Sequence, residues 1–438
     1  MLAILADRTY RHLFLAQIVA LLGTGLATVA LGLLAYDLAG GGAAMVLGTI
    51  FTIKMVAYVG IAPVASAVAE RVNRRRLLVA LDLVRGAVAV CLPFVAEAWQ
   101  VYLLIFVLQS ASAAFTPAFQ ATIPEVLPDE ARYTRALSLS RLAYDLENIA
   151  SPALAALLLA MVSYDALFFG TVAGFLASAA LVVSVVLPSP RPGPRRGIYD
   201  RTTRGIRIYL ATPRLRGLLA LNLAAAAAGA MVLVNSVVLV RAELGLGDSA
   251  LAWTLFAFGA GSMTAALALP RLLDRLPDRP VMLAGAALMA AALLGLAAAV
   301  AVAGPGWPVL LAAWTAAGLG YSAVLTPSGR LLRRSAHAGD RPAIFAAQFA
   351  LSHACWLLAY PLAGWLMTGF GTVPALVSLA ALAVLGIVLA LILWPAEEAE
   401  ALEHTHDDLP LEHPHVEGRR THSHPFVIDD LHRHWGRP

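Results

Sequence analysis

Twelve long apolar runs dominate the sequence, and they restrict the chain to folds that cross a lipid bilayer. A transmembrane helix needs about 20 mostly apolar residues to span about 30 Å of hydrocarbon. Apolar residues make up 60% of the chain and charged residues 13%, about half of the roughly 25% that is usual in soluble domains. The sequence therefore predicts an all-α polytopic membrane protein with twelve transmembrane helices. They are expected over residues 12–36, 43–69, 77–97, 99–123, 138–162, 165–187, 216–241, 250–273, 281–303, 307–330, 342–370 and 372–394.

Arginine marks one side of this bundle. Of the 31 basic residues, 27 lie in connections on one side or in the tail, and Arg241 alone lies in a connection on the other side. Cytoplasmic segments are enriched in Lys and Arg, so we expect both termini in the cytoplasm and the chain in the inner membrane. The chain then divides into an N-terminal six-helix half (1–187), an Arg- and Pro-rich cytoplasmic linker (188–215), a C-terminal half (216–394) and a cytoplasmic His-rich tail (395–438).

A short charged motif recurs in the two halves at an offset of 204 residues. Two such pseudo-symmetric halves predict a binding site at their interface near the bilayer midplane. The motif can form a cytoplasmic gate in which Glu70 pairs with Arg74 or Arg75 or faces a helix N-terminus. The alternative is that the arginines only enforce topology. The gating candidates are Glu70, Arg71, Asn73, Arg74, Arg75, Asp274, Arg275 and Arg279.

The first copy of the motif, Ser66 to Arg75, resembles the loop signature G-x-L-a-D-r-x-G-r-k of the major facilitator superfamily. Asn73 replaces the second glycine, and Asn tolerates the left-handed backbone that such a turn can adopt. In the fourth span, Gln109-Ser110-Ala111-Ser112-Ala113-Ala114 is similar to the family's q-G-x-g-a-a stretch. Phe106 stands where many proton-driven exporters of the family have an arginine linked to proton coupling.

In the fifth span, the stretch that starts with Ser151 and Pro152 is similar to the exporter motif G-P-x-x-G-G, with small residues in place of each glycine. The resemblance covers about residues 8–394 and is greatest to bacterial efflux members such as siderophore exporters. It implies a twelve-helix transporter that works by alternating access. The cargo site is then expected between spans 1, 2, 4, 5, 7, 8, 10 and 11.

Ionisable residues inside the spans are costly to bury and point to function. Asp82 and Arg85 are three residues apart and Arg141 and Asp145 are four apart, so each pair shares one helix face and can neutralise itself. For Asp82 and Arg85 we favour a structural role. Arg141 and Asp145 remain candidates for the cargo or coupling pathway.

Lys54 and Glu147 lie at comparable depths near the midplane, where a bridge between them would respond to protons or cargo. His353 is also at midplane depth, and its reference pKa of about 6.5 suits reversible protonation. The alternative for this histidine is a hydrogen-bonded packing group. Lys54, Glu147 and His353 therefore complete the coupling and substrate pathway.

Eight histidines of the tail form four His-x-His pairs, and each pair can offer two imidazoles to one ion in an extended chain. Such nitrogen-rich sites suit Zn, Ni or Cu, and no other cofactor is expected. Some nickel exporters of the superfamily have a similar tail. The alternative is a solvated tail or one that responds to pH. The metal-ligand candidates are His404, His406, His413, His415, His422, His424, His432 and His434.

These features favour a secondary transporter that exports a small molecule against a proton gradient. The alternatives are a Ni, Co or Zn exporter that uses the tail, and a membrane-anchored metal sensor. Catalytic motifs and a Walker-type phosphate loop are missing from the sequence, so we expect no enzymatic activity. The expected partners are the cargo and the bilayer, with no nucleic acid, and the expected state is a monomer.

Overall fold

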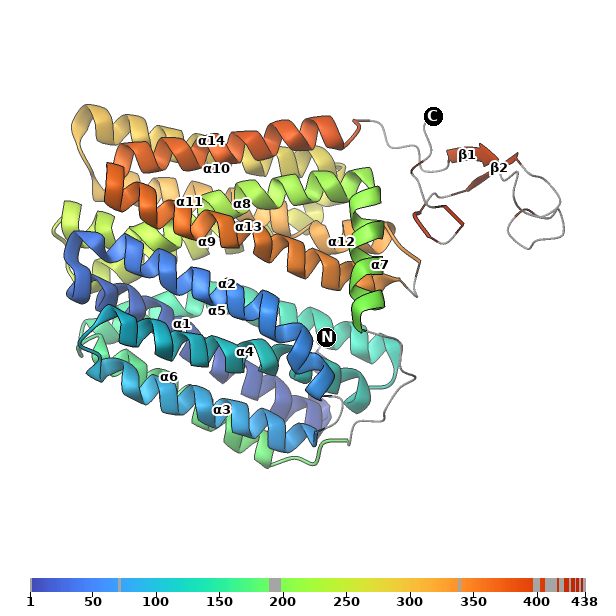
Figure 1. Cartoon of the computed structure of the whole chain (residues 1–438), viewed down its shortest axis with the longest axis horizontal. Helices are drawn as coiled ribbons and strands as arrows, with labels where there is room; N and C mark the ends of the chain where they lie inside the picture. The colour runs from blue at the N-terminus through green and yellow to red at the C-terminus, as the bar shows by residue number, and fades with distance from the viewer. Residues whose placement is uncertain are drawn as a thin grey trace.

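Two helical bundles lie side by side in the computed structural model of the chain, one built from α1–α6 and the other from α8–α14 (Figure 1). The structure describes residues 2–69, 72–188, 198–337, 340–396, 402–405, 416, 421–424, 427–429, 431, 432 and 435.

Each half contributes six long helices to the bundle. The first half and the helix after it comprise the 3-10 helix Leu2–Ala6, α1 (Arg8–Ala39), the 3-10 helix Gly40–Gly42, α2 (Ala43–Ala69), α3 (Arg74–Cys91), the 3-10 helix Leu92–Phe94, α4 (Ala98–Val126), α5 (Glu130–Leu159), α6 (Asp165–Val183) and α7 (Ile198–Ala211). The second half and the tail comprise α8 (Pro213–Val237), the π-helix Val238–Glu243, α9 (Asp248–Leu273), α10 (Asp278–Ala303), α11 (Trp307–Leu325), α12 (Ser328–Arg334), α13 (Arg341–Phe370), α14 (Thr372–Leu393), β1 (Leu402–Thr405) and β2 (Thr421–His424).

The predicted fold class is confirmed in the described part of the chain. Ten segments are long and apolar enough to cross a membrane, and the first of them, Arg8–Ile61, contains both α1 and most of α2. The twelfth long helix, α5, enters with the shorter apolar stretch Ala150–Leu159 of its described residues.

The offset of 204 residues seen in the charged motif also holds for the helices around it. Helix α2 ends at Ala69 and α9 at Leu273, and α3 begins at Arg74 and α10 at Asp278. The repeat is therefore a structural one, as two pseudo-symmetric halves require.

Polar residues just before the helices fix where several of them begin. Asp7 accepts a hydrogen bond from the Tyr10 amide, and Asp129 accepts one from the Arg132 amide, so both act as N-caps. Asn73 caps α3 in the same way and has φ −57°. The tolerance of Asn for a left-handed backbone is therefore not used at Asn73, because its side chain here serves the helix start.

The segment between the halves contains a helix that the sequence analysis did not anticipate. Helix α7 lies across one end of the bundle, on the side where α12 and the tail also lie (Figure 1). We call this end the α7 face and the opposite end, with Gly40–Gly42 and the π-helix, the far face. Arg204 of α7 pairs with Asp340 just before α13 (Nε–Oδ1 2.7 Å), which ties the linker to the C-terminal half.

The tenth span is one apolar segment over Trp307–Arg334, but its helix is interrupted inside the predicted range. Helix α11 ends at Leu325, and α12 begins at Ser328 after Pro327. Proline lacks the amide hydrogen needed inside a helix, and its ring clashes with the preceding turn. The chain therefore turns at Pro327 before α12.

Candidate functional site

The first copy of the repeated motif is held by an ion pair between α3 and α4. Arg74 is 5% exposed, and its Nη2 and Nε lie 2.7 Å and 3.3 Å from the two carboxylate oxygens of Glu125. Such two-point contacts fix geometry as well as charge. Glu70 and Arg71 lie outside the described residues, so the predicted pairing of Glu70 stays a prediction. The sequence analysis did not single out Glu125.

The second copy forms the corresponding contact with the charges exchanged. Asp278 begins α10 and is 3% exposed, and it accepts a hydrogen bond from Nε of Arg330 at 3.0 Å. Arg74 and Asp278 occupy equivalent places in the two halves, as their offset of 204 shows. The position at the start of the helix is therefore an arginine in the first copy and an acid in the second, and its partner has the opposite charge in each case.

The other motif residues have different surroundings. Asp274 and Arg275 are exposed in the turn before α10. Arg279 donates from Nε to the carbonyl of Trp394 at 3.0 Å, and Arg75 donates to the carbonyl of Val183. These two arginines therefore attach the loops to the ends of α14 and α6.

The predicted pairing of Asp82 with Arg85 is confirmed inside the first half. The Arg85 guanidinium pairs with the Asp82 carboxylate, and the Ser178 hydroxyl donates to the same carboxylate at 2.7 Å. The rings of Phe115 and Phe175 flank the guanidinium at 4.1 Å and 4.5 Å. With Asp82 fully buried, this group joins α3, α4 and α6 and supports the structural reading.

Two of the predicted pathway residues, one from each half, contact the same aromatic ring. The Tyr58 ring of α2 stacks on the His353 ring of α13 with centroids 5.6 Å apart, and Lys54 Nζ lies 5.9 Å from the Tyr58 centroid. His353 Nδ1 lies 2.6 Å from the carbonyl of Phe349. A carbonyl only accepts hydrogen bonds, so Nδ1 carries the hydrogen and Nε2 is the nitrogen that can take up a proton.

The histidine belongs to a row of rings along one face of α13. Phe349, His353, Trp356 and Tyr360 follow a spacing of three and four residues, which places them on one helix face. The row continues sideways to Tyr321 of α11, whose ring lies 6.3 Å from that of Trp356. These rings were not predicted from the sequence, although their spacing is a signal that reveals them.

The halves touch closely at the far-face end of α2 and α13. A Cβ atom on Gly48 would lie 2.9 Å from the carbonyl oxygen of Tyr360, and one on Gly364 would lie 2.5 Å from that of Ala44. Towards the α7 face, by contrast, Phe349 is 40% exposed. The two helices are thus in close backbone contact at the far face, while Phe349, nearer the α7 face, keeps part of its ring exposed.

The remaining candidates in the spans lie on α5, which packs against α9 of the other half. Arg141, Asp145 and Glu147 belong to this helix, and their side chains lie outside the described part of the structure. Ser151 is fully buried, and its hydroxyl lies 3.5 Å from the carbonyl of Leu22 in α1. Pro152 follows inside the helix, so this motif packs α5 against α1.

The tail folds back on itself in one place. Strands β1 and β2 pair antiparallel, with His404 opposite His422 and Leu402 opposite His424. His406, His413, His415 and His434 lie outside the described residues. Within the described part of the chain, no three His, Cys, Asp or Glu residues form a group that could hold a metal ion.

The end of the tail is docked on the α7 face. His432 is 5% exposed, and its Nδ1 lies 2.9 Å from Asp429 Oδ1, while His337 Nε2 lies 3.3 Å from Asp429 Oδ2. Burial raises the pKa of the Asp429 carboxyl, but the contacts from His432 outweigh it and hold that pKa below its usual value. Trp435 lies 5.3 Å from the guanidinium of Arg214.

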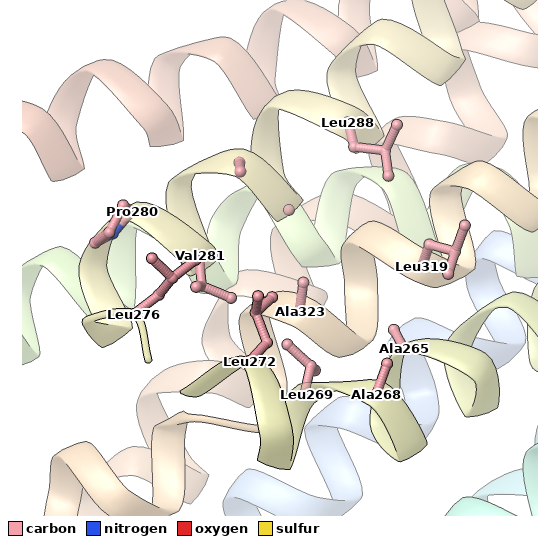
Figure 2. Close-up of a pocket in the computed structure, with 12 residues that line it drawn as sticks. Ala265, Ala268, Leu269, Leu272, Leu276, Pro280, Val281, Leu288, Leu319 and Ala323 are labelled. Atoms are coloured by element: carbon pink, nitrogen blue, oxygen red, sulfur yellow. The ribbon is translucent and has the colours of Figure 1, made fainter. Parts of the chain in front are cut away.

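A wide apolar pocket of about 390 Å³ lies elsewhere, between α9, α10 and α11 (Figure 2). Leu272, Val281 and Ala323 are among its lining residues, all of which are apolar. It lies within the second half and contains neither Lys54 nor His353. It is therefore separate from the residues that meet between the halves.

Comparisons with known proteins place this geometry in a family. A family model described as Major Facilitator Superfamily matches residues 13–234 and 218–425. The chain is 28% identical to Macrolide efflux protein A of Streptococcus pyogenes over 152 residues, which are 34% of this chain and 37% of that protein. It is 29% identical to the uncharacterized MFS-type transporter YfiS of Bacillus subtilis over 120 residues, 27% of this chain and 28% of that one. The matches thus span 37% of the first relative and 28% of the second.

Solved structures share the fold at low sequence identity. A bacterial homologue of the human lysosomal transporter Spinster, inward-facing and occupied, has a TM-score of 0.67 at 13% identity, over 87% of this chain and 95% of that one. A POT family transporter in complex with 5-aminolevulinic acid has a TM-score of 0.68 at 11% identity, over 88% and 95%. With the family model matching both six-helix halves, the chain belongs to the Major Facilitator Superfamily.

Proposed function

We propose that this protein is a secondary transporter that exports an amphipathic organic molecule by alternating access, driven by a proton gradient. The observation that carries the proposal is the meeting of Lys54 from one half and His353 from the other on the Tyr58 ring. Ionisable groups at membrane depth mark substrate or proton routes. The rings along α13 offer apolar surface to a cargo, and a relative named for macrolide efflux makes a macrolide the first probe.

In this proposal the α7 face is cytoplasmic, and so are both termini. The arginines of the motif and of α7 lie on that side, as the positive-inside rule requires. Proton uptake at Nε2 of His353 would place a second cation near Lys54, and Glu147 of α5 is the proposed partner for Lys54. The exchanged pairs Arg74–Glu125 and Asp278–Arg330 would then hold the cytoplasmic ends of each half as the halves move.

The test of this proposal is proton-driven flux in reconstituted vesicles with an imposed pH gradient. We expect Lys54→Ala, Glu147→Gln and His353→Ala each to lower macrolide flux by about tenfold or more. Placing a charge in the membrane costs about 2.5–3.5 kcal/mol, so a charged residue that the chain keeps there is expected to serve its function. Thr49→Ala is the control on α2, because its hydroxyl bonds to Met45 of its own helix. If proton-coupled flux stays intact in the three variants, the proposed role of these residues in coupling is contradicted.

A second candidate function is favoured by one feature of the tail. The β1–β2 pairing places His404 and His422 at opposite positions of the ladder, so one histidine from each of two His-x-His pairs comes together. We propose that the tail binds Zn, Ni or Cu there. Under this alternative the tail delivers the metal as cargo or senses it, and residues 396–438 should then control flux.

Metal titration of the full-length protein tests the tail. We expect Ni²⁺ or Zn²⁺ to bind with an affinity that falls by about tenfold or more in the double variant His404→Ala/His422→Ala, because each lost imidazole removes one of few ligands. His12→Ala is the control, since His12 bonds to Ser184 away from the tail. Equal affinity in the double variant and the control would contradict a site at the hairpin.

A further inference from the structure

The last turn of α1 and the end of α8 meet at the far face, and each belongs to a different half. Helix α1 contributes Tyr36. Helix α8 continues into the π-helix Val238–Glu243, which carries Arg241. The Arg241 guanidinium carbon lies 5.2 Å from the Tyr36 ring centroid, and the same guanidinium forms an ion pair with Asp248 at the start of α9. We call Tyr36, Arg241 and Asp248 the far-face clasp.

Each side of the clasp is anchored in its own half. Asp37, next to Tyr36, accepts a hydrogen bond from the Tyr164 hydroxyl at 2.6 Å. Burial and this carboxylate both raise the pKa of the Tyr164 phenol, so it remains a donor. On the other side, Glu243 of the π-helix accepts a hydrogen bond from Thr372 at the start of α14. A force that separates the halves would therefore act on the Tyr36–Arg241 contact before it reaches the anchors.

The backbone under Arg241 is unusual. The Leu244 amide donates to the carbonyl of Leu239 at 3.0 Å, which is the five-residue bond of a π-helix. Single π-helical turns are frequent at functional sites. A wider turn at this point changes the direction in which the residues after it project, and Arg241 is one of them.

The charge itself also needs an explanation. Arg241 is the one basic residue in a connection on the far face, against 27 on the other side or in the tail. The positive-inside rule accounts for those 27 and disfavours Arg241. A local role at the far face is therefore the better account of this arginine, and its stacking across the halves supplies one.

The helices just below the clasp are already packed closely. A Cβ atom on Gly32, one turn before Tyr36, would lie 3.4 Å from Leu251 of α9. Helices α1 and α9 thus lie near van der Waals distance at this level, and the clasp adds an attraction that can be made and broken. Cation–π contacts suit such a role because they are modest in strength.

From these contacts we infer that the clasp holds the two halves together at the far face, and that it opens once in every transport cycle. Arg241 is then a positioning residue for transport rather than a cargo ligand. This inference rests on the proposed alternating access.

The test measures the distance between the far-face ends of the two halves, with spin labels at Met161 and Val302. These positions are 85% and 89% exposed, so the labels disturb little. The native Cys91 and Cys355 are first replaced by alanine. We expect Arg241→Gln and Tyr36→Leu each to raise the ratio of long to short distances by about three- to tenfold, which is the range a cation–π contact supports.

Conservative variants separate a gating role from a general loss of packing. Tyr36→Phe keeps the ring and should give the original distances, and Arg241→Lys should recover most of the short distance. The double variant should resemble either single variant, since both remove one contact. Unchanged distances in Arg241→Gln and Tyr36→Leu, or a Tyr36→Phe variant that behaves like Tyr36→Leu, would overturn the clasp.

The same data distinguish this inference from the proposed function. If a long-distance population exists but its size does not change in the Arg241 and Tyr36 variants, the inference about the clasp is contradicted and alternating access is not. If neither the original protein nor any variant shows a long distance, alternating access itself is contradicted. Because the distances are measured without cargo, a wrong cargo assignment does not affect the result.

Discussion

Replacing Arg85 with alanine is expected to lower the free energy of unfolding by about 3–5 kcal/mol, because it leaves the Asp82 carboxylate buried without its cation. Asp82 is fully buried and Arg85 is 5% exposed. The Ser178 hydroxyl would still donate to the carboxylate, but a neutral donor does not cancel a charge in a hydrocarbon environment. The measurement is unfolding of the purified protein in mixed micelles, followed by tryptophan fluorescence.

The double variant Asp82→Leu/Arg85→Met shows whether the lone charge is the cause. Replacing a buried ion pair with apolar residues of similar size is often neutral or stabilising, so this variant should unfold like the original protein. Arg76→Ala, at the exposed start of the same helix, is the control for loss of an arginine and should change the free energy by less than about 0.5 kcal/mol. If the double variant is as unstable as Arg85→Ala, the ion pair is not the reason.

The membrane helices could be predicted closely from the sequence because their signal is local. Residues 43–69 form α2 as expected, and α13 and α14 also agree with their predicted spans to within one residue at each end. Bilayer thickness fixes the length of such runs. Helix α7 was missed because its arginines and neighbouring prolines obscured an amphipathic pattern, and the break at Pro327 was missed because the apolar composition continues across it.

The candidate site was predictable only in part, since its contacts join helices that are distant in sequence. Lys54 and His353 could be predicted from the free-energy cost of placing an ionisable group in the membrane, because such residues are rare at this depth. Lys54 and Tyr58 are neighbours on one helix face, but nothing local connects Tyr58 to His353, a residue about 300 positions away. Glu125 was missed for the same reason, as its partner Arg74 lies on another helix.

Replacing Gly364 with valine is expected to abolish most transport, because it forces α2 and α13 apart at the far face. Its Cβ would lie 2.5 Å from the Ala44 carbonyl oxygen and 3.2 Å from the Met45 Cα. These are backbone atoms that cannot rotate away, so the helices themselves must separate. Overpacking of this kind costs about 1–3 kcal/mol, which corresponds to a shift of about 5- to 150-fold away from the state closed at the far face.

Flux and the Met161–Val302 distance together test this expectation. Gly60→Val on α2 and Gly369→Val on α13 are matched controls, since a Cβ at either position meets no atom within 4 Å. The controls should keep the original flux and distances, whereas Gly364→Val should lose flux and show the long distance. A Gly364→Val protein that closes and transports normally would mean that the close contact between α2 and α13 at Gly364 is not what closes the far face.

The sizes of the two far-face effects are informative when compared. The close packing of α2 against α13 at Gly48 and Gly364 lets the halves meet at the far face, so its loss removes the closed state. The clasp, by contrast, only adds an attraction between Tyr36 and Arg241. Combining Gly364→Val with Arg241→Gln should therefore change the distances little beyond Gly364→Val alone, because a clasp cannot act across helices already held apart. If the two changes are instead fully additive, the clasp and this close packing act at separate steps of the cycle, and the single closing motion assumed for both is wrong.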